Sequence, residues 1–431
     1  VRARTINETM KIAAARALAR LAREDVPDEV DAAYAGRRLR YGPEYIIPVP
    51  FDPRLIGSIP PAVAEAAMES GVARKPIADI AHYRLELRSR LDPTADSLQF
   101  MFEKVRTAPR RVVFAEGEEE RAIRAAIAFR SAGYGTPVLI GRENHIRETM
   151  TAAGLAHVED LEIHNAKVSR NNRRYAEFLY ERLQRSGSLM RDCQRMVNQD
   201  RNIFAACMVA NGDADAMVTG LTRAFSTCFD DIRRVVDPQS HHVLYGLSIL
   251  VVRGRTVFIA DTTVNELPTG EQLADIAIQS AGKARQMGHE PRVALLSFSN
   301  FGQPMRQRAQ HVRDAVKLLD QRGVDFEYDG EMSAEVALDF DLKQRLYPFC
   351  RLSGPANVLI MPALHAANIG GKMLQKLGGA TLVGPLLIGL EKPAQIVQMG
   401  ATVNELVTAA AIAAHDAIAL GAETDAVTAA D

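Results

Sequence analysis

The chain has 431 residues, of which 47% are hydrophobic and 24% charged, and its formal net charge at pH 7 is -1. A chain of this length can bury enough apolar surface for two or three domains without disulfides or structural metals. The near-neutral charge argues against a nucleic-acid-binding protein, because neutralising phosphates requires an excess of Lys and Arg. The four cysteines stand far apart without a C-x-x-C pair, which predicts free thiols in a cytoplasmic protein.

The first segment, residues 1–95, is predicted to be helical and rich in proline. Apolar side chains recur at helical spacing near its start, namely Ile6, Met10, Ala13, Ala14, Ala17, Leu18 and Leu21. Prolines interrupt longer elements between residues 43 and 76, and the pair Pro60-Pro61 predicts a helix that starts there and runs over residues 62–68. We expect this proline-rich run to be a surface connection rather than a core of its own.

From about residue 110, short apolar runs alternate with helical patterns. RRVVFAEG is predicted as a buried strand over residues 112–114, GEEERAIRAAIAFRSAG as a helix, and TPVLIGR as the next strand. The alternation continues through DADAMVTG, HHVLYGLSILVV, RTVFIADTTV, PRVALLSFSN and ANVLIMPAL. This pattern predicts an α/β fold with mostly parallel sheets flanked by helices. No stretch of about 18 consecutive apolar residues is present, so we expect no membrane span.

Loops beyond the carboxyl ends of parallel strands are where ligands bind in such folds. In PALHAANIGGK, Gly370 and Gly371 are predicted to expose backbone N–H groups at a strand-to-helix turn. Lys372 and Lys376 follow at i,i+4 and share one helix face, which suits a phosphate-bearing ligand. The alternative is that these lysines form an ordinary solvated helix face.

A second candidate for anion binding follows the predicted strand DADAMVTG, in GLTRAFSTCFDDIRRVV. Arg223 and Arg233 are suited to bidentate contacts with phosphate. In the alternative interpretation, Asp230 and Asp231 pair locally with Arg233 or Arg234, and the sequence does not decide between the two.

Polar side chains at other predicted strand ends are candidates for binding a metal or a ribose hydroxyl. They are Asp261 and Asn265 in IADTTVNE and Asp329 and Glu331 in DGEMSAE. No further acid or histidine stands at metal-ligand spacing, so metal binding is the minority interpretation. A G-x-G-x-x-G fingerprint is absent as well, and no nicotinamide site is visible. Composition and spacing therefore predict a two-domain α/β protein with an anion-binding cleft, without naming the ligand.

Two parts of the sequence resemble known families. The motifs VVFAEGEEERAIRAA, DADAMVTG, IADTTVNELPTGEQLADIAIQSA, VALLSFSNFG, YDGEMSAEVAL, NVLIMPALHAANIGGKMLQKLGG and GATVNELV resemble phosphate acetyltransferases (phosphotransacetylases) in the same order, over about residues 105–425. ARTINETMKIAAARALA and YIIPVPFDPRLIGSIPPAVAEAAMESGVARKPI resemble the last stretch of a bacterial malic enzyme. The combination resembles the hybrid NADP-dependent malic enzymes. This implies that Val1 lies just beyond the malic-enzyme catalytic part, where NADP and Mg²⁺ or Mn²⁺ would bind.

The resemblance also implies an architecture and partners. We expect a malic-enzyme tail and linker over residues 1–95, followed by a two-lobed phosphotransacetylase-like domain of the isocitrate/isopropylmalate dehydrogenase type. Its first lobe is expected over 96–245, completed by 395–431, and its second lobe over 246–394. The expected partners are an upstream malic-enzyme domain and a second copy that forms a homodimer within a larger homo-oligomer.

Residue by residue, the resemblance indicates that catalytic groups are lost. In active phosphotransacetylases a Ser-Arg-Gly stretch binds and polarises the acyl group and phosphate, and an Asp six residues after the Arg is the proposed base for the CoA thiol. Gln398, Met399 and Glu405 stand at the Ser, Arg and Asp positions. A thioether cannot stabilise developing negative charge as a guanidinium does, so acyl transfer is expected to be severely impaired. Another family arginine falls on Leu183, with Arg182 beside it.

Groups that bind phosphate and CoA in the family are kept by contrast. Arg233 corresponds to a phosphate-contacting arginine, and Lys372 and Lys376 to the basic residues that hold CoA phosphates. The predicted acetyl-CoA site is completed by Arg223, Asn368 and Gly370. The resulting hypothesis is a regulatory acetyl-CoA-binding module of a malic enzyme that converts malate to pyruvate and CO2, without acetyl transfer of its own. The alternatives are an active phosphate acetyltransferase, a structural oligomerisation module, and a sensor of a different acyl-CoA.

Overall fold

The computed structural model describes residues 1–24, 26, 41–43, 45–50, 52, 54–89, 93–155, 158, 160–252 and 255–430. The chain divides into two compact units, Val1–Gln99 and Phe100–Asp431. The first unit contains the helices α1 (Glu8–Arg23), α3 (Arg54–Glu69) and α4 (Ile80–Ser89), and α5 (Pro93–Thr107) runs across the boundary. The predicted opening helix is confirmed, and the Asn7 side chain caps it by accepting a hydrogen bond from the Met10 N–H at 3.0 Å.

The proline pair lies inside a helix rather than at its start. Helix α3 begins at Arg54, well ahead of Pro60 and Pro61. Proline weakens a helix interior because it lacks an N–H donor, but α3 buries Ala66 and Ala67 in a small apolar cluster that includes Met10 of α1. Packing between the two helices outweighs the local cost, so this run contributes to a core and is more than the expected surface connection.

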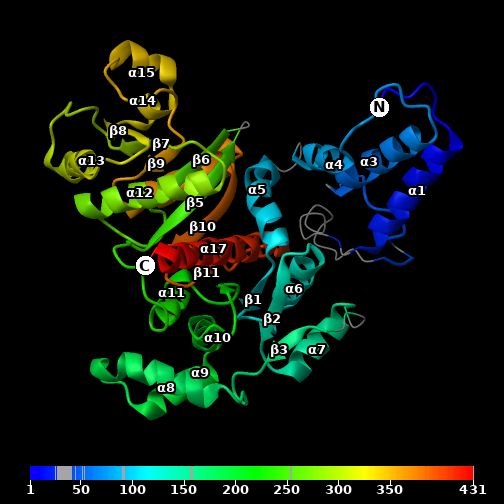
Figure 1. The fold of residues 1–431 in the computed structure, drawn as a ribbon, viewed down its shortest axis with the longest axis horizontal. Coiled ribbons are helices and arrows are strands. Elements are labelled where there is room, and N and C mark those ends of the chain that lie inside the picture. Colours follow the sequence, from blue (N-terminus) through cyan, green and yellow to red (C-terminus); the bar gives the residue numbers. More distant parts are fainter. Residues whose placement is uncertain are drawn as a thin grey trace. The chain divides into compact units, whose positions relative to one another are not determined.

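The second unit contains two sheets (Figure 1). The first lobe, as we call the five-stranded sheet with α6 to α11 and α17, has the parallel strand order β11-β4-β1-β2-β3. Its strands are β1 (Arg110–Phe114), β2 (Gly135–Ile140), β3 (Glu162–His164), β4 (Ala216–Thr219) and β11 (Ala394–Ile396). Its helices are α6 (Glu120–Ser131), α7 (Glu143–Ala152), α8 (Asn172–Leu183), the 3-10 turn η1 (Gln184–Ser186), α9 (Met190–Gln199), α10 (Arg201–Ala210), α11 (Phe225–Arg233) and α17 (Val403–Ala430).

Helices cover both faces of this sheet, as the alternation of side chains along β1 shows. Val113 packs in a cluster with residues of α8, α9 and α10. Val112 and Phe114 point to the other face and pack in a cluster with residues of α6 and α17. A strand that is apolar on both faces reads as a continuous apolar run, which is why RRVVF was recognisable in the sequence.

The second lobe consists of a six-stranded sheet with α12 to α16, in the strand order β10-β5-β6-β9-β7-β8. Strand β5 pairs antiparallel with β10 and β6, whereas the pairs β6–β9, β9–β7 and β7–β8 are parallel. Its strands are β5 (Tyr245–Val252), β6 (Arg255–Ala260), β7 (Arg292–Leu296), β8 (Glu327–Met332), β9 (Val358–Ile360) and β10 (Thr381–Ile388). Its helices are α12 (Gly270–Gln286), the 3-10 turn η2 (Gln307–Ala309), α13 (Gln310–Arg322), α14 (Ala334–Leu338), α15 (Phe340–Leu346) and α16 (Leu364–Gly378). The predicted α/β class with parallel and mixed sheets is confirmed.

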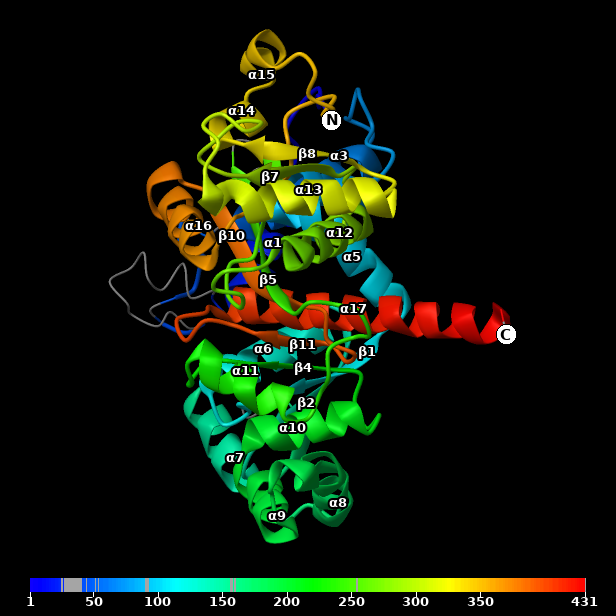
Figure 2. The same ribbon diagram turned by 90° about the vertical axis from the view of Figure 1, so that its left-hand side faces the viewer.

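The chain passes between the lobes twice. It leaves the first lobe after α11, builds the second lobe, and returns through β11, which adds a strand beside β4. Helix α17 then runs between the two lobes (Figure 2), packed on β1, β4 and α6 of the first. The first lobe is therefore assembled from two separate stretches of sequence.

By length and composition, α17 is the one helix among the described residues that could cross a membrane, over Val403–Ala422 with a mean hydropathy of 1.3. Glu405 and Asp416 interrupt its apolar residues, so the sequence contains no run of about 18 consecutive apolar residues here. Leu406 and Ala414 lie in the core cluster of the first lobe. We interpret α17 as a core helix, since buried helices pass the same test.

Candidate ligand-binding site

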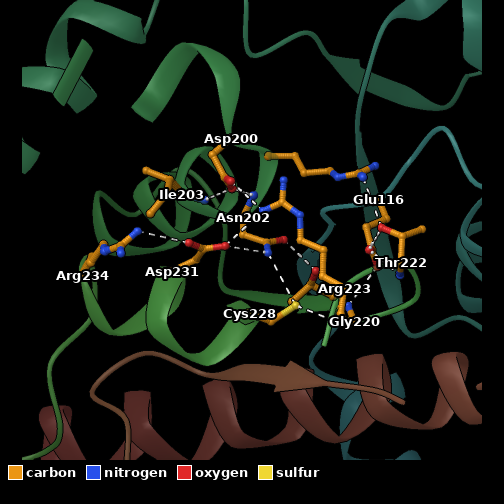
Figure 3. Close-up of polar contacts among 12 residues, drawn as sticks. Glu116, Asp200, Asn202, Ile203, Gly220, Thr222, Arg223, Cys228, Asp231 and Arg234 are labelled. Carbon is orange, nitrogen blue, oxygen red and sulfur yellow. Dashed lines mark hydrogen bonds and ion pairs between the residues drawn. The ribbon is translucent and has the colours of Figure 1, made fainter. Parts of the chain in front are cut away.

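A buried carboxylate organises the loop that follows β4. Glu116, two residues after β1, is 2% exposed. Its oxygens accept hydrogen bonds from the N–H groups of Gly220 (2.9 Å), Leu221 and Thr222 (2.8 Å) and from the Thr222 hydroxyl (2.6 Å), as Figure 3 shows. Gly220 has a φ of +117°, and a Cβ there would lie 2.1 Å from the carbonyl oxygen of Val397, so only glycine fits. The loop is held in one shape.

The same loop delivers Arg223 to two carboxylates. Its Nη1 lies 2.6 Å from Asp200 and 3.1 Å from Asp231. Asn202 donates to Asp231 at 3.2 Å and accepts a hydrogen bond from the Thr219 hydroxyl at 2.7 Å, which completes the network in Figure 3. Burial raises the pKa of Asp231, and the neighbouring Asp200 carboxylate raises it further. The structure therefore brings Arg223 into an ion-pair network, and a ligand phosphate would have to compete with two acids for it.

Arg233 and Arg234 at the end of α11 have different hydrogen-bond and ion-pair partners. Arg234 pairs with Asp231 at 3.4 Å, which is the local pairing that the sequence left open. Arg233 is half-buried and donates to the Val236 carbonyl at 3.2 Å. No ion pair of Arg233 is found within the part of the chain that the structure describes. Arg233 is therefore the arginine of this segment that is best placed to meet an anion, and its contact with phosphate stays a prediction.

At the end of α8, Leu183 packs against apolar side chains, whereas its neighbour Arg182 forms an ion pair. Leu183, at the position of a family arginine, packs against the apolar core of the first lobe. Arg182 pairs instead with Asp237 at 2.8 Å, and the hydrogen bond from its guanidinium lowers the pKa of that carboxyl. An arginine is thus present beside Leu183 but is held by an acid of the first lobe.

In the second lobe, α16 carries both lysines on one exposed flank. Lys372 and Lys376 are exposed, and no ion pair of either is found among the described residues. At about 100° per residue they lie beside the apolar flank of Ile369, Met373 and Leu377, whose exposed fractions are 56%, 54% and 81%. Both lysines lie on α16 at the predicted i,i+4 spacing, and their binding of a phosphate stays a prediction.

The predicted glycine turn before these lysines is wrong. Helix α16 begins at Leu364, so Gly370 and Gly371 lie in its second turn. Their N–H groups face carbonyls four residues back along the helix and are not open to an anion. The Asn368 amide donates to the Thr262 carbonyl at 3.2 Å and so ties α16 to the loop after β6. A pair of glycines usually marks a turn, but a helix that packs on its own lobe tolerates glycine in its interior.

The loop before α17 presents the side chains that replace the family's catalytic groups. Gln398 and Met399 are exposed, with Met399 at 56%. Arg121 of α6 holds this loop, since its guanidinium donates to the carbonyls of Met399 (3.2 Å) and Ala401 (2.6 Å). A guanidinium near Met399 is therefore committed to backbone oxygens. In Figure 2 this loop lies between α16 of the second lobe and α11 of the first, on one side of the ribbon.

Glu405, at the position of the proposed base, takes part in a capping box. Its carboxylate accepts a hydrogen bond from the Thr402 N–H at 2.8 Å, and the Thr402 hydroxyl accepts one from the Glu405 N–H at 3.2 Å. This reciprocal arrangement stabilises the start of α17. The carboxylate would have to give up its capping bond to act as a base.

The acids at the strand ends of the second lobe are hydrogen-bonded to donors of the protein. Asp261 is saturated by N–H donors of its own loop and of Gly246. Asp329 and Glu331 lie within β8 rather than at the predicted strand end, and Glu331 accepts hydrogen bonds from Ser299 (2.6 Å) and Arg313 (3.0 Å). Over the described residues, no group of three or more His, Cys, Asp or Glu is close enough to hold a metal ion.

The five-stranded and six-stranded sheets, each flanked by helices, form a two-lobed α/β protein of the phosphotransacetylase fold. Solved structures with this fold include a phosphotransacetylase from Streptococcus pyogenes, with a TM-score of 0.70 and 27% identity over 74% of this chain and 99% of that chain. The EutD phosphotransacetylase from Staphylococcus aureus gives a TM-score of 0.69 and 28% identity over 75% of this chain and 98% of that chain.

Residues 97–414 match the phosphate acetyl/butaryl transferase family, and the chain belongs to that family. It is 31% identical to the phosphate acetyltransferase of Clostridium acetobutylicum, over 74% of this chain and 97% of that protein. It is also 58% identical to an NADP-dependent malic enzyme of Rhizobium meliloti over 97% of this chain, but over only 55% of that protein. The chain thus spans about half the length of the malic enzymes that it matches. Both resemblances seen in the sequence are confirmed.

Proposed function

We propose that the chain is a regulatory acetyl-CoA-binding module of an NADP-dependent malic enzyme and does not itself transfer acetyl groups. In the whole protein, an upstream malic-enzyme domain would convert malate to pyruvate and CO2 with NADP and Mg²⁺ or Mn²⁺. The four cysteines are free and buried, and burial raises the pKa of the Cys207 thiol to about 12, which suits inert thiols in the cytoplasm.

The proposal rests on a contrast between two sets of side chains. The binding lysines, Lys372 and Lys376, are exposed on one flank of α16. The groups expected to do chemistry are replaced or engaged, since Met399 offers no charge and Glu405 caps α17. Acyl transfer needs donors aimed at the developing negative charge, whereas holding a CoA phosphate needs only accessible cations.

Regulation would follow from a ligand that touches both lobes. The lysine flank belongs to the second lobe, whereas Arg233 and the Met399 loop belong to the first. A ligand bound across them favours one angle between the lobes and shifts the population toward it. If the activity of an attached domain depends on the angle between the lobes, acetyl-CoA binding changes that activity by the same linkage.

The test of inactivity is an acetyl transfer assay with acetyl phosphate and CoA. We expect a turnover at least about 100-fold below that of the Clostridium acetobutylicum relative, since losing one charge-stabilising donor costs about that much. Comparable turnover would establish the first alternative, an active phosphate acetyltransferase. Family membership is what favours that alternative.

A second copy is the partner that we propose for the apolar flank of α16. Ile369, Met373 and Leu377 repeat at i,i+4,i+8 on α16, and the strand that follows this helix, β10, lies at the edge of the six-stranded sheet formed by the described residues. Exposed apolar stripes of this kind mark protein interfaces, and symmetric homodimers are the commonest assemblies. If acetyl-CoA does not bind at all, this surface supports the alternative of a structural oligomerisation module.

Changing Leu377 to Glu is expected to convert the dimer to a monomer, because it places a charge at the most exposed position of the apolar flank. Sedimentation velocity over a range of concentrations measures the mass. Lys167→Glu, an exposed change in the first lobe, is the control and should leave the dimer intact. A wild-type chain that sediments as a monomer at every concentration would disprove this assembly.

A further inference from the structure

The two lobes are joined by a narrow hinge, which we define as residues 237–245 and 388–395. The two strands of the hinge bond to each other: the Gln239 N–H donates to the Gly389 carbonyl at 2.8 Å, and the Glu391 N–H donates to the Asp237 carbonyl at 3.0 Å. The Gln395 amide closes one end through bonds to the backbone of Leu387 at 2.9 and 3.2 Å. A two-stranded connection of this kind lets the lobes rotate unless another contact holds them.

One polar contact beside the hinge joins the lobes directly. The Lys283 ammonium on α12 of the second lobe forms an ion pair and hydrogen bond with Asp416 on α17 of the first. The side chains are only 4% and 17% exposed. Burial alone would raise the pKa of Asp416, but the charge and hydrogen bond of Lys283 together with His415 outweigh burial and lower that pKa. Separating a buried ion pair is costly, because each charge has lost its hydration and would be left without a partner.

The same face of α12 also contacts the hinge. One turn before Lys283, the Gln279 amide donates to the Val243 carbonyl at 3.2 Å, and the Ser280 hydroxyl donates to the Tyr245 hydroxyl at 3.0 Å. His415 and Tyr245 are further ionisable neighbours of the pair, and the His415 Nδ1 lies 3.6 Å from the Asp416 carboxylate. Movement of α12 relative to α17 would therefore disturb the hinge and the ion pair together.

We propose that Lys283 and Asp416 form an interlobe latch that holds the lobes at the angle of this structure and thereby tunes the affinity for a ligand bound across them. The first half of the proposal concerns the chain alone. The second half rests on the proposed function, since it needs a ligand that contacts both lobes. With the latch removed, such a ligand must order the lobes itself, so its affinity falls.

The test replaces the pair by apolar side chains of similar size, Lys283→Met with Asp416→Leu, in the full 431-residue chain. This double variant leaves no unpaired buried charge. The control is Arg322→Met with Asp275→Leu, which removes an ion pair that also involves α12 but stays within the second lobe. Hydrogen exchange without ligand is measured at the hinge, and the Kd of acetyl-CoA is measured by calorimetry.

We expect hinge exchange to rise about tenfold in the latch variant and not in the control, and the Kd of acetyl-CoA to rise about fivefold. Unchanged hinge exchange in a variant that still unfolds cooperatively would refute the latch. Should the apolar pair fail to fold, Asp416→Asn, which keeps the shape but removes the charge, carries the same expectation. Absence of acetyl-CoA binding in the wild-type chain would refute the proposed function while the exchange measurement still decides the latch.

Discussion

Glu116→Ala is expected to lower the free energy of unfolding of the second unit by about 4 kcal/mol. The carboxylate is 2% exposed and receives hydrogen bonds from the N–H groups of Gly220, Leu221 and Thr222. Removing it leaves those donors buried without a partner, which costs more than the net worth of the bonds. Denaturant unfolding followed by circular dichroism measures the effect.

Two further variants show whether the charge or the mere presence of a side chain is responsible. Glu116→Gln keeps the volume and one acceptor but turns an amide N–H₂ toward N–H donors, so it should lose a large part of the stability. Glu119 is the N-cap residue of α6, and its side chain makes no capping hydrogen bond. Glu119→Ala should therefore change the free energy of unfolding by less than about 0.5 kcal/mol. Equal losses for Glu116→Ala and Glu119→Ala would contradict the role given to Glu116.

Removing both charges of the lysine flank, Lys372→Ala with Lys376→Ala, is expected to weaken acetyl-CoA binding about 50-fold. Each charge-assisted contact with phosphate contributes about 1 to 2 kcal/mol, and about 1.4 kcal/mol corresponds to a tenfold change in Kd. The side chains are exposed on α16, so their loss should leave unfolding nearly unchanged. Calorimetric titration with acetyl-CoA measures the affinity, and raising the salt concentration should weaken wild-type binding more than binding by the variant.

The matched control removes two lysines elsewhere, Lys104→Ala with Lys167→Ala, both of which are exposed. It changes the net charge of the chain by the same amount but lies outside α16. If it weakens binding as much as the α16 variant, the effect is one of overall charge, and the lysine flank is not the phosphate site.

Much of the fold was predictable because its central strands are apolar runs. The strands around Val113, Met217 and Val293 stand out in the sequence, since their side chains are buried on both sides of a sheet. Asp329 and Glu331 were expected at a strand end, whereas they lie within strand β8, where distant partners such as Arg313 satisfy Glu331. Strands β3 and β11 span three residues each, too few for a pattern to appear.

The site was predictable where it depends on neighbours along a helix. Lys372 and Lys376 follow from the i,i+4 rule alone. Glu116 was missed because its partners lie 104 to 106 residues away, and nothing in FAEG marks a carboxylate that binds a loop. Arg223 was expected to face a ligand, because the sequence does not show that Asp200, 23 residues earlier, reaches it. Such pairings depend on strand order, which only the fold supplies.

The most direct test of the proposed function is a calorimetric titration of the wild-type chain with acetyl-CoA in the absence of any other ligand. We predict saturable binding with about one acetyl-CoA per chain and a Kd below about 1 mM, which corresponds to about 4 kcal/mol of binding free energy. A titration without binding heat at several temperatures and with millimolar acetyl-CoA would contradict the proposal that this module senses acetyl-CoA.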